Sequence, residues 1–199
     1  MLDYTIEHFQ QKAIGIIDWD YKDEKQLSLL KDDRIFSLNV LELENVLMDI
    51  DILEKMKEHC LASDDGVTCS INVLMENCKE NISKQATKHT SNLIVSQIKS
   101  SLSSENREFE RFKQKISEIC NLEKMEERYI EHLSKLQEYI NTHNYQELYK
   151  IFDFNHEIDR FVKKGIVDDY KNRVIRLINN NSEVQKILRS RYFFDIPDV

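Results

Sequence analysis

The sequence is poor in the residues that interrupt regular structure. Only three glycines and one proline occur in 199 residues, although these two residue types dominate turns and break helices. The shortage excludes a loop-rich or low-complexity chain and favours long helices. Hydrophobic residues make up 41% and charged residues 32% of the chain, as in ordinary folded domains. A chain of this length buries a substantial core, so we expect one α/β unit with a helical tail.

Long apolar runs are missing as well. No run approaches the roughly 20 consecutive apolar residues that a membrane-spanning helix requires. The N-terminal sequence MLDYTIEHF lacks the basic and then apolar order of a secretory signal. We therefore expect a cytoplasmic protein that has no membrane partner.

Metal-binding cysteine pairs and an excess of positive charge are also lacking. Cys60, Cys69, Cys78 and Cys120 form no CxxC pair, and His59 is not followed by a second ligand at zinc-finger spacing. We expect reduced thiols that pack as small apolar groups. The formal net charge of −8 repels a polyanion, so any nucleic acid must bind at a local basic patch or through metal ions.

An apolar run near the N-terminus indicates a buried strand. Residues 12–20, KAIGIIDWD, hold a continuous apolar run that ends in Asp18 and Asp20, and such runs are typical of a central parallel strand. Residues 34–40, RIFSLNV, read as a second strand, and residues 21–31 between the two place leucines near one helical face. Strand, helix and strand within about thirty residues match the size of a βαβ unit.

From Leu41 onward the apolar residues follow helical spacing. Residues 71–102 and the segment that begins at Phe109 hold apolar side chains at steps of three and four. We expect these two segments to form a helical hairpin that turns around residues 100–104. A third helix is expected near residues 125–142, followed by shorter helical pieces.

The two aspartates at the end of the first strand are the strongest candidates for chemistry. Side chains at i and i+2 of a regular strand point to the same face, so the carboxylates of Asp18 and Asp20 would lie side by side. They would repel each other unless a cation lay between them. Hard divalent cations such as Mg²⁺ prefer oxygen ligands and leave positions for water and phosphate, which suits phosphodiester chemistry. The alternative is that both aspartates end the strand and cap a helix that starts near Lys22.

A second acidic pair follows the second strand. Glu42 and Glu44 are again two residues apart, and Asn45 follows them. Because neighbouring parallel strands open onto one crevice, Glu44 is a candidate third metal ligand. The alternative is a solvated helix N-terminus, where acidic residues interact favourably with the helix dipole.

Together these motifs resemble a known family. The strings GIIDWDY and IFSLNVLELENVLMD are similar to the pattern of a bacterial family of Toprim-like proteins related to OLD-type nucleases. The Toprim effector of PARIS anti-phage systems is a member, and family members are often fused to, or encoded beside, ABC-type ATPases. The resemblance covers residues 13–53, and Asp18, Asp20 and Glu44 match the family's metal-binding positions residue by residue.

The resemblance implies both a fold and a function. The fold is α/β, with a partial Toprim-like parallel sheet in residues 1–60 and a mainly helical extension in residues 61–199. The function is a nuclease that cleaves DNA or RNA in anti-phage defence, with Asp18 and Asp20 as catalytic residues. Mg²⁺ or Mn²⁺ would be held by these two aspartates and Glu44. An ABC-type ATPase and further copies of the chain are candidate partners.

The sequence also departs from the family pattern. A complete Toprim domain has an earlier strand that ends in a glutamate, whereas seventeen residues precede Asp18 here and Glu7 lies in a segment that reads as helix. Where the family carries a late Gly-Lys, the chain has Asn155 and His156. Two hypotheses remain open. The chain is a nuclease that needs further residues or a partner for full activity, or it is a catalytically inactive binding module that partners an ABC-type ATPase.

Overall fold

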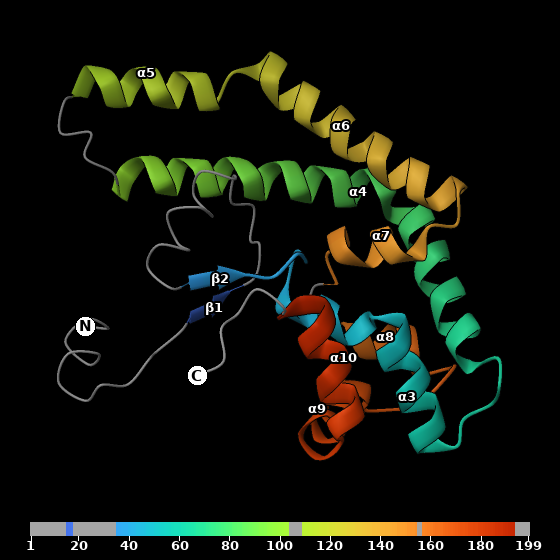
Figure 1. Cartoon of the computed structure of the whole chain (residues 1–199). Helices are drawn as coiled ribbons and strands as arrows, with labels where there is room; N and C mark the ends of the chain where they lie inside the picture. The colour runs from blue at the N-terminus through green and yellow to red at the C-terminus, as the bar shows by residue number, and fades with distance from the viewer. Residues whose placement is uncertain (1–14, 18–34, 104–108, 155–156, 194–199) are drawn as a thin grey trace, which may run out of the picture.

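The computed structural model describes residues 15–17, 35–103, 109–154 and 157–193, and within them the chain is mostly helical with one small parallel sheet (Figure 1). The elements, in chain order, are β1 (Gly15–Ile17), β2 (Ile35–Ser37), the 3-10 helix η1 (Leu43–Met48), α3 (Ile50–Cys60), α4 (Gly66–Ser103), α5 (Phe109–Ile119), α6 (Leu122–Asn141), α7 (Tyr145–Ile151), α8 (Ile158–Val162), α9 (Tyr170–Asn180) and α10 (Ser182–Tyr192). The expectation of an α/β chain whose bulk is helical is therefore confirmed. Within the same residues, no helix combines the length and the apolar character needed to cross a membrane.

β1 and β2 pair in parallel, as the apolar runs predict. Ile17 at the end of β1 lies opposite Ser37 at the end of β2, and the N–H of Leu38 donates to the carbonyl of Ile17 at 3.0 Å. Both strands therefore end at the same edge of the sheet. The segment that joins them, residues 18–34, lies outside the described residues.

The second strand is shorter than the expected residues 34–40. Beyond Ser37 the backbone leaves the sheet, and the N–H of Leu41 donates at 2.7 Å to the carbonyl of Lys150 in α7. Leu38 and Val40 are buried in the core of the helical part. Packing against the helices, rather than strand pairing, therefore accounts for the apolar residues at the end of this run.

α4 is the longest described helix, and it contacts α3, α5, α6 and α8. Its sequence contains no glycine after Gly66 and no proline, so no helix-breaking residue interrupts it. The backbone leaves helical geometry at one described residue, Asn81, with φ −112° and ψ 15°. Figure 1 shows the helix changing direction in this part of the chain.

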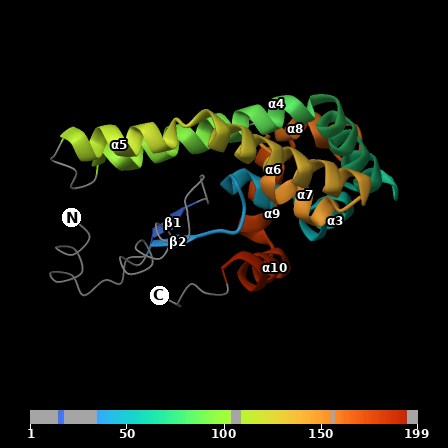
Figure 2. The same ribbon diagram turned by 90° about the horizontal axis from the view of Figure 1, so that it is seen from above.

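The helices after α4 run back along it. α6 makes its main contacts with α4, and α5 packs on α4 as well. Figures 1 and 2, which differ by a quarter turn, both show α5 and α6 beside α4. α4 and α5 pack on each other as expected of a helical hairpin, but α4 stays helical through Ser103, so the chain does not turn as early as residues 100–103. α6 begins three residues earlier than the expected residue 125, because the side chain of Asn121 caps its first turn by accepting from the N–H of Lys124 at 3.0 Å.

One buried cluster joins the segment after β2 to the helices. It includes residues of η1, α3, α4 and α6 to α10. Its largest fully buried side chains are Tyr149, Tyr170, Phe152, Phe154, Leu38, Met48, Ile52, Leu53, Met56, Leu74, Leu136 and Leu148. Residues on both sides of position 60 thus share this core. The division into units 1–60 and 61–199 stays a prediction.

Two of the three glycines fix the start of α4. Gly66 lies against Gly165, which follows α8, and a Cβ on either residue would collide with the backbone carbonyl of the other. The hydroxyl of Ser70 also lies beside Gly165 and donates to the carbonyl of Gly66 at 2.9 Å. Glycine is required at both positions because only a residue without a side chain permits this approach.

The four cysteines are free thiols, as expected. Cys78 is fully buried in the core, where burial raises its pKa to about 12. Cys120 is exposed, so the expected packing as an apolar group does not hold for it.

Candidate functional site

The aspartates predicted to bind metal follow the described end of β1. Asp18 and Asp20 lie outside the described residues, so their role stays a prediction. The described strand stops at Ile17, the residue before Asp18, and Ile17 is in register with Ser37 of β2. Among the described residues, no three His, Cys, Asp or Glu side chains gather closely enough to hold a metal ion.

Glu44 lies in the first turn of η1 and carries an ion pair. Its Oε1 atom is 2.8 Å from Nζ of Lys171 in α9. The alternative of a solvated helix N-terminus is therefore right about the position of Glu44 in the helix. It is not right about the solvation, because the carboxylate is only 23% exposed. The backbone N–H of Lys171 is itself held by the carboxylate of Asp159 at 2.9 Å. A metal ion at Glu44 would have to share this carboxylate with the lysine.

Asn45, the residue after Glu44, anchors η1 to the end of α7. Its side-chain Nδ2 lies 2.7 Å from the carbonyl of Tyr149, 3.2 Å from that of Lys150 and 3.0 Å from that of Phe152. Asn45 is fully buried, so these contacts replace the hydrogen bonds that its amide N–H groups would form with water. The position of Glu44 is therefore set by a rigid neighbour.

Two tyrosines bind the other end of η1. The hydroxyl of Tyr170 donates to the carbonyl of Leu47 at 2.5 Å, and the hydroxyl of Tyr145 donates to the carbonyl of Met48 at 2.6 Å. Burial raises the pKa of both phenols well above the ordinary value, so both remain protonated donors. These contacts satisfy carbonyls at the end of a short helix that has no intrahelical partner for them.

A buried carboxylate joins α3, α7 and α10. Asp49 caps α3 by accepting from the N–H of Asp51 at 2.9 Å, and it is fully buried. It also accepts from the hydroxyl of Tyr192 at 2.6 Å and from that of Tyr149 at 3.1 Å. Arg191 donates to both oxygens of Asp49 at 2.5 Å and also pairs with Asp51. The Asp49 carboxylate is thus fully occupied by the protein's own donors, which indicates a structural role.

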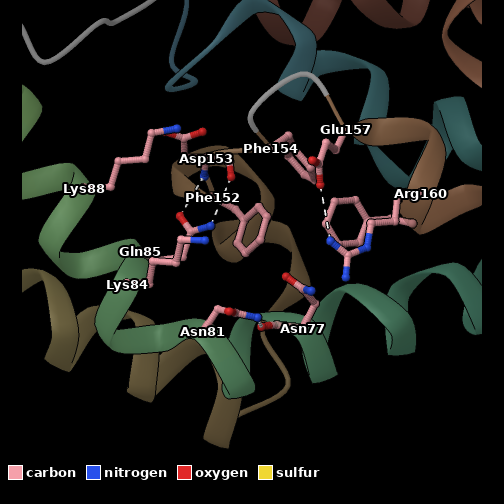
Figure 3. Close-up of a pocket in the computed structure, with 11 residues that line it drawn as sticks. Asn77, Asn81, Lys84, Gln85, Lys88, Phe152, Asp153, Phe154, Glu157 and Arg160 are labelled. Carbon is pink, nitrogen blue, oxygen red and sulfur yellow. Dashed lines mark hydrogen bonds and ion pairs between the residues drawn. The ribbon is translucent and has the colours of Figure 1, made fainter.

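A pocket of about 190 Å³ lies beside the bend in α4 (Figure 3). Its lining combines amides, cations, acids and aromatic rings: Asn77, Asn81, Lys84, Gln85, Lys88, Phe152, Asp153, Phe154, Glu157, Arg160 and Phe161. One wall comes from α4, and the other comes from the segment after α7 and from α8 with the residue that precedes it. The aromatic rings form an edge-to-face cluster, with centroids 4.9 to 5.8 Å apart. Asn155 and His156, which the family resemblance singles out, lie outside the described residues.

Two histidines stack between α4 and α6. The rings of His89 and His132 have centroids 3.6 Å apart and are inclined by 3°. Burial lowers the pKa of His89 to about 4 and that of His132 to about 3. Both rings are therefore neutral at neutral pH, which permits face-to-face contact without charge repulsion.

The pocket and the Asp49 cluster were not predicted from the sequence. Asn77, Asn81, Lys84 and Lys88 follow helical spacing, but a polar stripe of this kind normally indicates a solvated face. The side chains that donate to Asp49 are separated from it by 100 residues or more along the chain, so no local pattern connects them. Comparisons with protein-family models, with curated proteins and with solved structures found no match for the chain.

Proposed function

We propose that the chain is a metal-dependent nuclease of Toprim type, with Asp18 and Asp20 as metal ligands and catalytic residues. The observation that carries this proposal is the parallel, in-register pairing of β1 and β2. In parallel sheets, ligands bind at the carboxyl ends of the strands. Asp18 is the first residue beyond β1, and Asp20 follows two positions later.

The donor set fits a hard divalent cation. Carboxylate oxygens are the ligands that Mg²⁺ and Mn²⁺ prefer, and a bound ion would polarise a phosphodiester and activate water. Glu44 is the proposed third ligand, and η1, in which it lies, is the first helix after β2. Its present partner is Lys171. The positive charge of this lysine would also attract a phosphate group of the substrate.

The biological setting is proposed on the resemblance alone. The strings around Asp18 and Glu44 are similar to proteins that act as effectors of anti-phage defence beside ABC-type ATPases. We therefore propose DNA or RNA as the substrate and an ATPase of this class as a partner.

The test is a cleavage assay on the full chain. Labelled single-stranded DNA, double-stranded DNA and RNA are each incubated with the protein and Mg²⁺ or Mn²⁺. We expect slow cleavage of one of these substrates that stops when the metal is chelated. Asp18→Asn and Asp20→Asn should each abolish it, because each removes a charged ligand.

The matched control is Asp64→Asn, which removes the same charge from an exposed loop residue. This variant should cleave as fast as the wild type. Cleavage that survives in Asp18→Asn and Asp20→Asn would refute the assignment of these residues.

A binding module is the second candidate function. The observation that favours it is the ion pair between Glu44 and Lys171, which already neutralises one of the three proposed ligands. In this case the chain would bind an ABC-type ATPase without cutting nucleic acid. A protein that binds the purified ATPase and shows no metal-dependent cleavage would support this function over the nuclease.

A further inference from the structure

We propose that the pocket beside the bend in α4 binds a small phosphate monoester. This site is separate from the proposed metal ligands, and the proposal does not rest on nuclease activity. The starting observation is a stripe of polar side chains on α4. Asn77, Asn81, Lys84 and Lys88 are spaced by four, three and four residues, so they share one face of the helix.

This polar stripe faces other parts of the protein as well as solvent. Opposite it stand Phe152 and Phe154, which are each only 1% exposed. A helix face that packs on aromatic residues normally carries apolar side chains. Figure 3 shows Asn77 and Asn81 along α4, with Lys84 and Lys88 of the same helix on one side of the opening and Arg160 on the other. Polar groups thus surround an opening with an apolar back wall, the composition of a ligand site.

The bend in α4 shapes the floor of the pocket. At Asn81 the backbone leaves helical geometry, and the side-chain Nδ2 of this residue donates to the carbonyl of Asn77 at 2.9 Å. The side chain thus forms a hydrogen bond with the backbone one turn earlier, in the part of the helix that bends.

The wall opposite the bend is held in place by α4 itself. The side chain of Gln85 accepts from the N–H of Asp153 at 3.3 Å and donates to its carbonyl at 3.1 Å. Lys88 pairs with the buried carboxylate of Asp153 at 2.6 Å. Backbone and side chain of Asp153 are both fixed, so this part of the pocket wall is ordered before any ligand binds, which limits the entropy lost on binding.

The charges in the pocket favour an anion. Three cations, Lys84, Lys88 and Arg160, face two carboxylates, Asp153 and Glu157, although the whole chain carries a net charge of −8. Lys88 is committed to Asp153. The remaining carboxylate, Glu157, therefore faces two cations.

Lys84 and Arg160 are the cations that can reach a ligand. Lys84 is exposed and forms no ion pair with a residue in the described part of the chain. The pair of Arg160 with Glu157 spans 3.3 Å, and its side chains are 65% and 54% exposed. An ion pair this exposed contributes little stability, so a ligand can displace it.

The volume of the pocket decides the size of the ligand. About 190 Å³ is less than the roughly 300 Å³ at which pockets for drug-sized molecules begin. A phosphate monoester carries a charge of about −1.5 to −2 near neutral pH. This charge balances the two cations more fully than the single negative charge of the Glu157 carboxylate does. The amides of Asn77 and Asn81 provide further hydrogen-bonding groups for the ester portion.

The test is a titration of the full chain with ribose 5-phosphate, with ribose as the uncharged control ligand. The buffer contains a chelator, so that the proposed metal site plays no part. We expect ribose 5-phosphate to bind with a Kd of about 1 mM or tighter in calorimetry, and ribose not to bind. Lys84→Gln and Arg160→Gln should each weaken binding by about tenfold, because each removes a charged donor.

Lys79→Gln is the matched control, because Lys79 is an exposed lysine of α4 that does not line the pocket. It should bind like the wild type, as should Asp18→Asn with Asp20→Asn. Circular dichroism shows whether each variant is folded. Three outcomes would overturn the proposal. The first is no binding of ribose 5-phosphate at about 10 mM, and the second is a loss of affinity in Lys79→Gln equal to that in Lys84→Gln and Arg160→Gln. The third is Lys84-dependent binding of a DNA oligonucleotide by a chain that does not bind ribose 5-phosphate.

Discussion

At the scale of single residues, Asp49 connects the most distant parts of the described chain. Its carboxylate is buried, and Arg191, Tyr149 and Tyr192 all donate to it. Removing a charge from water is costly, so a buried carboxylate is tolerated only when several donors compensate it. Arg191 is 39% exposed, which leaves part of its own hydration intact. The cluster therefore fixes how α10 docks on α3.

The Tyr192 hydroxyl provides a direct test of this cluster. We expect Tyr192→Phe to lower the free energy of unfolding by roughly 1.5–3 kcal/mol, the range for a hydrogen bond to a charged group. The measurement is urea unfolding at neutral pH. Tyr129→Phe is the control, because the Tyr129 hydroxyl forms no hydrogen bond with another residue of the described part of the chain. Equal stabilities of the two variants would show that the Asp49 carboxylate does not depend on Tyr192.

At the scale of elements, the stacked histidines make the packing of α4 on α6 sensitive to acid. The charged groups that act on the pair are Glu131 and Lys135 of α6 and Asp153 after α7, which itself pairs with Lys88. Burial is the largest cause of both lowered pKa values, and Lys135 lowers both further. A proton on either ring would place a charge against a ring 3.6 Å away.

The direction of the pH effect follows from these values. In the unfolded chain the two histidines bind protons near their ordinary pKa of 6.5, whereas in the folded chain they bind them only near pH 4 and 3. The stability that they contribute is therefore complete above pH 6.5 and is lost as the pH falls towards 4. We expect the free energy of unfolding to fall by about 3–4 kcal/mol between pH 7 and pH 5, about half of it from each histidine.

Two variants separate the histidine pair from other acid effects. His89→Phe with His132→Phe keeps two stacked rings but removes both titrating groups, so most of the decrease between pH 7 and pH 5 should disappear. His59→Gln, at an exposed position of α3, should keep it. Urea unfolding at both pH values is the measurement, and a phenylalanine variant with an undiminished decrease would contradict the assignment.

The helices and strands also show which structural features could be predicted from the sequence alone. Apolar steps of three and four predicted α4, α5 and α6, because helix periodicity is a local property. The second strand was predicted too long, because Leu38 and Val40 are buried in the core of the helical part and the backbone of Leu41 bonds to Lys150, more than a hundred residues later. The pocket was missed for the same reason. The sequence around Lys84 does not indicate that Phe152 and Arg160 lie on the opposite wall of the pocket.

At the scale of the whole molecule, the core ties the end of the sheet to the helices. The chain passes from β2 into η1, and η1 is held by Asn45, Tyr145 and Tyr170. The sheet edge that precedes Asp18 is thus linked to a rigid helical body through a short segment. The sequence predicted this edge and its parallel pairing, whereas the ion pair of Glu44 with Lys171 depends on a residue 127 positions away.

The most direct test of the proposed metal site is the melting temperature of the full chain with and without Mg²⁺ or Mn²⁺. The ion offsets the repulsion between Asp18 and Asp20 and binds only the folded chain, so saturating metal should raise the melting temperature by about 4 °C or more. Asp64→Asn with Asp168→Asn removes the same two charges at exposed positions and should keep this increase. Asp18→Asn with Asp20→Asn should fold but lose it. An equal increase in this last variant, or no increase in the wild type, would contradict the metal site.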